Sequence, residues 1–85
     1  MSKKDKLKER FRSKPKDFRY SELRSLLISI GYLESNRGGT SGSSVSFYNE
    51  IYQSLITLHK PHNPDLLKSY QIKAILAELE THNLI

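Results

Sequence analysis

The sequence predicts a small α+β sandwich in which two helices cover one face of a three-stranded antiparallel sheet. Two observations predict this fold. Two separate segments carry apolar residues at helical spacing, and the region between them, residues 32–59, has short alternating runs interrupted by glycine. The 85 residues allow one domain at most. The expected element order is helix–strand–strand–strand–helix, preceded by an extra basic helix.

The N-terminal residues 1–19 form a basic arm. They hold nine Lys or Arg against three Asp or Glu, a net charge of +6, so the remainder of a +5 chain is at −1. Segment 3–14 is expected to be a helix that needs a surface to dock on, because Leu7 and Phe11 are its only apolar pair. Pro15 ends that helix, and a linker is expected over residues 15–20. The arm suits polyanion binding, since each cation on a phosphate releases a counterion, or it only solubilises the chain.

The expected domain, residues 20–85, opens with the clearest helix. Ser21 and Glu22 provide the chemistry of a helix start, and Gly31 is suited to the C′ position after its end. The apolar stripe expected to be buried consists of Leu23, Leu26, Leu27 and Ile30.

Three strands are expected next, over residues 32–37, 44–48 and 55–59. A glycine-rich loop joins the first two, and Asn49-Glu50 is expected to turn the second into the third, although it lacks the glycine that favours tight hairpins. A last helix is expected over residues 69–81, with an apolar stripe of Ile72, Ile75, Leu76 and Leu79.

The alternation along the strands assigns their faces. Val45, Phe47, Ile56 and Leu58 are expected to face the helices, because successive side chains point to opposite sides of a sheet. Leu55 faces the other way. The face away from the helices is expected to be polar and open, with Ser44, Ser46, Tyr48, Thr57 and His59 on it.

Composition excludes several classes of protein. There is no cysteine, so disulfide scaffolds and thiolate metal sites are excluded. Apolar runs such as residues 26–28 and 74–77 are far too short to span a membrane, and no apolar segment follows the basic start as in a secretory signal. We therefore expect a cytoplasmic protein without a membrane partner.

Four short motifs occur in a fixed order between residues 20 and 77. They are Glu22-Leu23-x-x-Leu26-Leu27-x-x-x-Gly31-Tyr32, Thr40-Ser41-Gly42-Ser43-Ser44-x-x-Phe47, Ile56-Thr57-Leu58-His59-Lys60-Pro61-His62 and Leu66-x-Lys68-x-Tyr70-x-Ile72-x-x-Ile75-Leu76.

This order of motifs resembles the HicA toxin family of bacterial toxin–antitoxin pairs. The resemblance implies a fold like a double-stranded-RNA-binding domain, an endoribonuclease activity on mRNA, and neutralisation by a HicB-type antitoxin. In that family a catalytic histidine commonly follows the Gly-Ser pair that opens the second strand. Here Ser44 follows Gly42-Ser43, and serine has no group that titrates near neutral pH. The alternative is a non-catalytic module that binds RNA or an antitoxin or other protein.

Two histidines lie near the expected sheet. Cleavage of RNA by its own 2′-hydroxyl needs a base, an acid and a cation near the phosphate, and His59, His62 and Lys60 are suitable types. Ordinary solvated histidines are the alternative. A metal site at His59-x-x-His62 with Asp65 lacks a further firm ligand, so no metal and no cofactor are expected.

The candidate site residues fall into two groups. The catalytic candidates are Ser44, His59 and His62, with Ser44 at the position of the family histidine. The RNA-binding candidates are Lys3, Lys4, Lys6, Lys8, Arg10, Arg12, Arg37, Gly42, Ser43, Lys60 and Lys68.

Overall fold

The computed structural model of this chain describes residues 3–35, 44–61 and 64–85. The candidates Arg37, Gly42, Ser43 and His62 lie outside the described residues. The elements, in chain order, are α1 (Lys3–Arg12), α2 (Tyr20–Ser29), β1 (Leu33–Ser35), β2 (Ser44–Asn49), β3 (Ser54–His59) and α3 (Ser69–Thr81).

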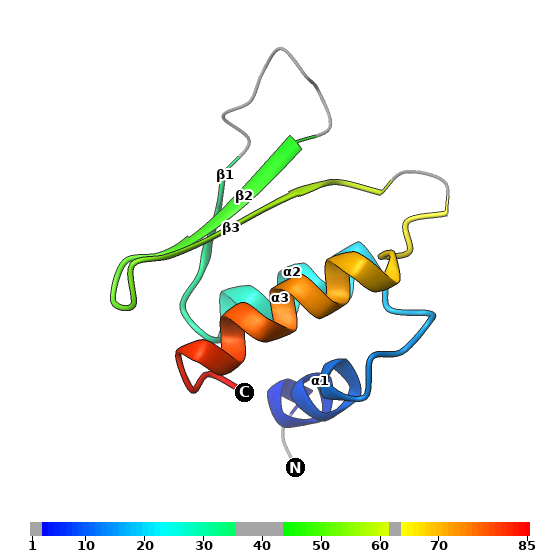
Figure 1. Cartoon of the computed structure of the whole chain (residues 1–85), viewed down its shortest axis with the longest axis horizontal. Helices are drawn as coiled ribbons and strands as arrows, with labels where there is room; N and C mark the ends of the chain where they lie inside the picture. The colour runs from blue at the N-terminus through cyan, green and yellow to red at the C-terminus, as the bar shows by residue number, and fades with distance from the viewer. Residues whose placement is uncertain (1–2, 36–43, 62–63) are drawn as a thin grey trace.

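The predicted α+β architecture is confirmed: a three-stranded antiparallel sheet has order β1-β2-β3, and helices lie on one side of it. Figure 1 shows three levels, with the sheet at the top, α2 and α3 beneath it, and α1 below these two helices. The bounds expected for the last helix agree with α3. Among the described residues, no helix is long and apolar enough to cross a bilayer.

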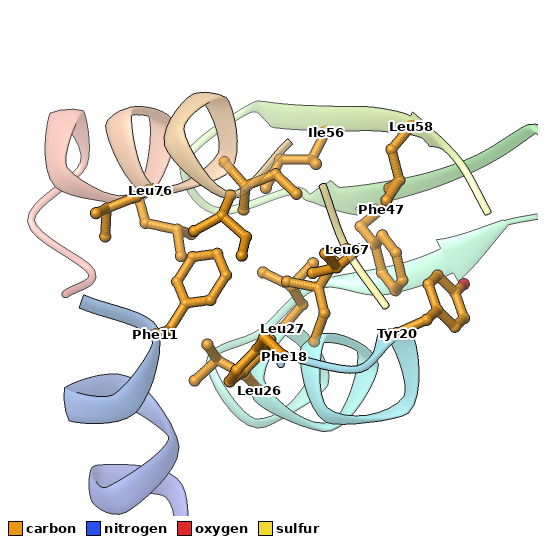
Figure 2. Packing of buried hydrophobic residues seen from close by; sticks show 14 of the residues in the cluster. Phe11, Phe18, Tyr20, Leu26, Leu27, Phe47, Ile56, Leu58, Leu67 and Leu76 are labelled. Carbon is orange, nitrogen blue, oxygen red and sulfur yellow. The ribbon is translucent and has the colours of Figure 1, made fainter. Parts of the chain in front are cut away.

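The assignment of strand faces is also confirmed. Val45, Phe47, Ile56 and Leu58 are buried, while Tyr48, Leu55, Thr57 and His59 are exposed. Figure 2 shows side chains from the sheet and the helices meeting in one apolar cluster. The helix residues expected to be buried are also in it, except that Ile30 is only partly buried: Leu23, Leu26, Leu27, Ile72, Ile75, Leu76 and Leu79.

The first strand begins at Leu33, one residue later than expected. Tyr32 is fully buried, and its hydroxyl lies 2.6 Å from Ser54 Oγ, so this residue belongs to the junction below the sheet and not to the strand. The preceding Gly31 has φ +106°, which favours glycine, and a Cβ there would lie 3.0 Å from Asn49 Nδ2. The expected helix stop at Gly31 is therefore confirmed.

The side chain of Asn49 stabilises the β2–β3 turn, which contains no glycine. Its Oδ1 accepts hydrogen bonds from the backbone N–H groups of Ile51 (3.1 Å) and Tyr52 (3.3 Å), and its Nδ2 donates to the Ile30 carbonyl at 3.3 Å. The positive φ that the turn needs falls on Gln53, at +49°. Asparagine favours turns because its side chain bonds to the backbone two residues on.

The arm packs onto the rest of the chain. Phe11 of α1 is fully buried against Phe18, with ring centroids 5.0 Å apart. Arg10 forms ion pairs with Glu22 and, at 3.0 Å, with Asp17. Residues on both sides of the expected boundary at 19 and 20 therefore contribute to one core.

Part of the expected linker, residues 15–20, is held in place. The backbone N–H of Leu67 donates to the Phe18 carbonyl at 2.9 Å, and that of Tyr20 donates to the Asp65 carbonyl at 2.9 Å. These bonds fix residues 18–20 beside the segment that leads into α3.

Candidate nucleic-acid interface

The outer face of the sheet, the one away from α2 and α3, is open and divides into two halves. One cross-strand row is apolar: Leu33 is opposite Tyr48, and Tyr48 is opposite Leu55. Leu33 and Leu55 are 74% and 60% exposed, so the expectation of a polar face is wrong for this half. The remaining rows are polar and consist of Ser35, Ser46, Thr57, Ser44 and His59.

The polar half brings two catalytic candidates together. Ser44 and His59 are directly opposite each other in the register of β2 and β3, where Cβ atoms lie about 4.5–5.5 Å apart. In the next row the hydroxyls of Ser46 and Thr57 are 3.2 Å apart. This half of the face is therefore lined with hydroxyl groups beside one exposed imidazole.

A buried glutamine fixes the position of His59. Gln71 is only 7% exposed, and both ends of its amide are used: Nε2 donates to the His59 carbonyl at 3.1 Å, and Oε1 accepts from the Lys68 N–H at 3.0 Å. The end of β3 and the start of α3 are thus connected through one side chain. The role of Gln71 was not predictable from the apolar spacing of α3, because Gln71 is a polar residue outside the apolar stripe of that helix.

Next to His59 lies a hollow of about 430 Å³, here called the cationic pocket. It is lined in part by His59, Lys60, Lys68, Tyr70 and Gln71. Both lysines were candidates for RNA binding, and the structure places them on the same hollow. An anionic ligand that reaches His59 therefore meets two ammonium groups.

Lys60 is positioned by an aromatic ring. Its Nζ lies 5.1 Å from the ring centroid of Tyr20, a distance suited to a cation–π interaction. The Tyr20 hydroxyl donates to Glu34, which also accepts from Arg24 Nε at 2.8 Å. This network was not predictable from the sequence, because Tyr20, Arg24 and Glu34 come into contact only when α2 packs against β1.

The same contacts shift two pKa values in opposite directions. Burial, and then the hydrogen bond to the Glu34 carboxylate, raises the pKa of the Tyr20 hydroxyl. Burial by itself raises the pKa of Glu34, but the hydrogen bonds from Tyr20 and Arg24 outweigh burial and hold it below the usual 4.5. Glu34 is thus kept as an anion near Lys60 at neutral pH.

The arm is not part of this surface. α1 lies on the far side of α2 and α3 from the sheet (Figure 1), and Arg10 is engaged with Glu22 and Asp17. The cations of α1 that stay exposed are Lys3, Lys4, Lys6 and Arg12, with Lys8 half-buried. The arm and the polar half of the sheet therefore present separate positive regions.

The third histidine lies at the other end of α3. His82 Nε2 is 3.1 Å from Glu78 Oε2, which also accepts from Ser54 Oγ at 2.6 Å. Within residues 3–35, 44–61 and 64–85, no group of three or more His, Asp or Glu is arranged to hold a metal ion.

No family model matches the chain, and no curated protein or solved structure matches it significantly. The polar half of the outer face and the cationic pocket beside it are therefore the features that point to a function.

Proposed function

We propose that this chain is an RNA-binding protein of the HicA type, a cytoplasmic endoribonuclease that acts on mRNA and is neutralised by a HicB-like antitoxin. The observation that carries the proposal is the pairing of Ser44 with His59 at the edge of a pocket that holds Lys60 and Lys68. In this proposal the sheet and helices correspond to a double-stranded-RNA-binding fold, which reads backbone shape rather than sequence.

The chemistry assigned to the site is attack by a ribose 2′-hydroxyl on the adjacent phosphorus. His59 takes the proton of the 2′-hydroxyl, the new O–P bond forms, and the bond from phosphorus to the 5′-oxygen breaks. In this proposal the leaving oxygen receives its proton from His62, the other candidate catalytic histidine. Lys60 and Lys68 stabilise the charge on the phosphate oxygens, and the Ser44 hydroxyl donates to one of them.

The test compares one RNA hairpin with the same hairpin made of DNA. The proposal predicts RNA fragments ending in 2′,3′-cyclic phosphate and 5′-hydroxyl groups, and intact DNA, which lacks the attacking 2′-hydroxyl. Cleavage of both substrates, or RNA fragments with 5′-phosphates, would contradict this mechanism.

A second candidate function is RNA binding without cleavage. It is favoured by Ser44 itself, which stands where the family commonly has its catalytic histidine. Here purified protein would retain intact RNA in a gel shift, and affinity would fall by about 0.7–0.9 log units per log unit of salt for each phosphate contact. Replacing the exposed cations of α1 by glutamine tests the arm without removing the buried Phe11, because unchanged affinity would show that these cations contact no phosphate.

A further inference from the structure

The outer edge of β3 is an unprotected sheet edge. Among the described residues no strand pairs with it, because the sheet order ends at β3. Its six residues, Ser-Leu-Ile-Thr-Leu-His, pair with β2 in unbroken register and contain neither proline nor lysine. Natural proteins usually protect an exposed edge with such residues or with bulges, because free backbone groups template the addition of another strand.

The free backbone groups of this edge can be identified. The His59 carbonyl accepts a hydrogen bond from Gln71 Nε2 of α3, the helix that packs against β3, and therefore points towards the open edge. Backbone polar groups alternate between the two sides of a strand, so those of Leu55 and Thr57 point the same way as those of His59. The free groups at the open edge are thus the N–H and C=O of Leu55 and Thr57 and the N–H of His59, whose carbonyl is already bonded to Gln71.

A trough runs along this edge, between β3 and α3. Two hollows of about 160 and 180 Å³ follow from the cationic pocket towards the far end of α3, and Thr57, Ala74 and Ile75 line both. Ala74 is exposed and small, so the middle of the trough has room for a side chain. We call it the β3–α3 trough, and its walls include Leu55, Thr57, His59, Tyr70, Ala74 and Glu78.

The widths of the two layers explain the trough. Three strands at their usual spacing make a sheet about 14 Å wide, whereas two helices side by side cover about 20 Å. The helical layer therefore extends past the sheet by about the width of one strand. Since α3 packs against β3, the overhang beside β3 is formed by α3.

We propose that the β3–α3 trough receives an extended segment of a partner protein, which adds to the sheet as a fourth strand antiparallel to β3. Antiparallel pairing continues the existing sheet and is slightly more stable per residue than parallel pairing. It places the N-terminal end of the added segment beside His59, where Lys60 and Lys68 line the cationic pocket, and its C-terminal end beside Glu78. The segment therefore carries acidic residues at its N-terminal end, followed by alternating apolar residues.

A second copy of this chain fits the edge less well. Pairing two β3 strands at about 4.8 Å would bring two overhanging α3 helices closer than the 8–10 Å that packed helices require. A partner that contributes only an extended segment avoids this clash.

The test uses the full chain and a synthetic peptide of glutamates followed by alternating valine and threonine, with both ends blocked. We expect saturable binding that gives new hydrogen-exchange protection to the amides of Leu55, Thr57 and His59. The amides of Ile56 and Leu58, which face β2, should change little. A peptide with the same residues in reverse order should bind about tenfold more weakly, equivalent to about 1.4 kcal/mol.

Two variants and a control locate the binding. Thr57→Pro removes an edge N–H that makes no bond to β2, and Ala74→Trp fills the trough from α3; each should weaken peptide binding by about tenfold, or about 1.4 kcal/mol. Ala77→Trp places the same ring at another exposed position of α3 and should leave binding unchanged. The exchange pattern of β1 and β2 without peptide should be the same in all variants, which verifies folding.

Several results would overturn the inference: no saturable binding of the glutamate-first peptide, equal binding of the reversed peptide, or protection outside β3. Protection of the same amides that rises with protein concentration alone would show that a second copy occupies the edge instead. The measurement contains no RNA, so its failure is distinguishable from failure of the proposed RNA-binding function.

Discussion

The two ends of α3 contact β3 in different ways. At the C-terminal end Ser54, only 1% exposed, links the hydroxyl of Tyr32 to the carboxylate of Glu78. At the N-terminal end Gln71 holds the backbone of His59, while the imidazole of His59 stays exposed beside a hollow of about 430 Å³. At the C-terminal end the polar side chains hydrogen-bond to one another, and we call it the closed end. At the N-terminal end the cations and the imidazole remain available to a ligand, and we call it the open end. Polar groups at the closed end should affect stability, and those at the open end should affect binding and catalysis.

The largest expected effect separates the two histidines. His59→Ala should lower the rate of RNA cleavage by about 10²–10⁴-fold, the usual contribution of a general acid or base, because His59 is proposed to take the 2′-hydroxyl proton. Its stability should change by less than about 0.5 kcal/mol, since the side chain is exposed. Cleavage rates of the two single variants, His59→Ala and the control His82→Ala, check this. Equal loss in both would remove the distinction between the ends of α3.

The second prediction compares two serines of the sheet. Ser54→Ala should lower the free energy of unfolding by about 1–3 kcal/mol, because the buried Tyr32 hydroxyl loses its partner. The control Ser44→Ala should stay within about 0.5 kcal/mol of the wild type but weaken RNA binding. Urea unfolding of both variants measures the difference. An equal loss of stability at Ser44 would show that the open end is structural as well.

The third prediction concerns Gln71, the side chain that connects the end of β3 to the start of α3. Gln71→Leu leaves the Lys68 N–H and the His59 carbonyl without this partner, so stability should fall by about 0.5–1.5 kcal/mol. RNA cleavage should fall as well, because the end of β3 is no longer tied to α3. Unfolding and cleavage assays on this variant test both effects, with Glu80→Leu, at an exposed position of α3, as the control.

The smallest expected effect depends on pH. The hydrogen bond from Ser54, and then the contact with His82, lowers the pKa of Glu78 below 4.5, although burial opposes them. A carboxyl group with a lowered pKa stabilises the fold above its unfolded pKa and loses that contribution as pH falls through the folded value. The melting temperature of Glu78→Gln should therefore fall less than that of the wild type as pH drops below 4.5. Parallel curves would show that Glu78 contributes no such dependence.

Apolar periodicity was enough to predict most of the fold. Spacing located the buried stripes of α2 and α3, and alternation assigned Val45, Phe47, Ile56 and Leu58 to the core, because burial follows the geometric repeat of each element. The later start of the first strand was not predictable in this way. Tyr32 leaves the strand because its hydroxyl reaches Ser54, which is 22 residues away in sequence.

The candidate site was predictable only in part. Alternation placed Ser44 and His59 on one face, but it could not reveal the apolar row, since Leu33 joins Tyr48 and Leu55 only through the register of β1. Gln71 and the Tyr20–Glu34 network were missed because their partners come from other elements. The sequence also could not predict that the arm lies away from the sheet face, because this depends on the side of α2 and α3 against which α1 packs.

The central claim is that RNA lies on the polar half of the outer face and in the cationic pocket. A map of amide chemical shifts with a 2′-O-methylated RNA hairpin, which cannot be cleaved by 2′-hydroxyl attack, tests it most directly. We predict that the largest shifts fall on Ser44, Ser46, Thr57, His59, Lys60 and Lys68. Shifts confined to α1, or to the row of Leu33, Tyr48 and Leu55, would contradict it.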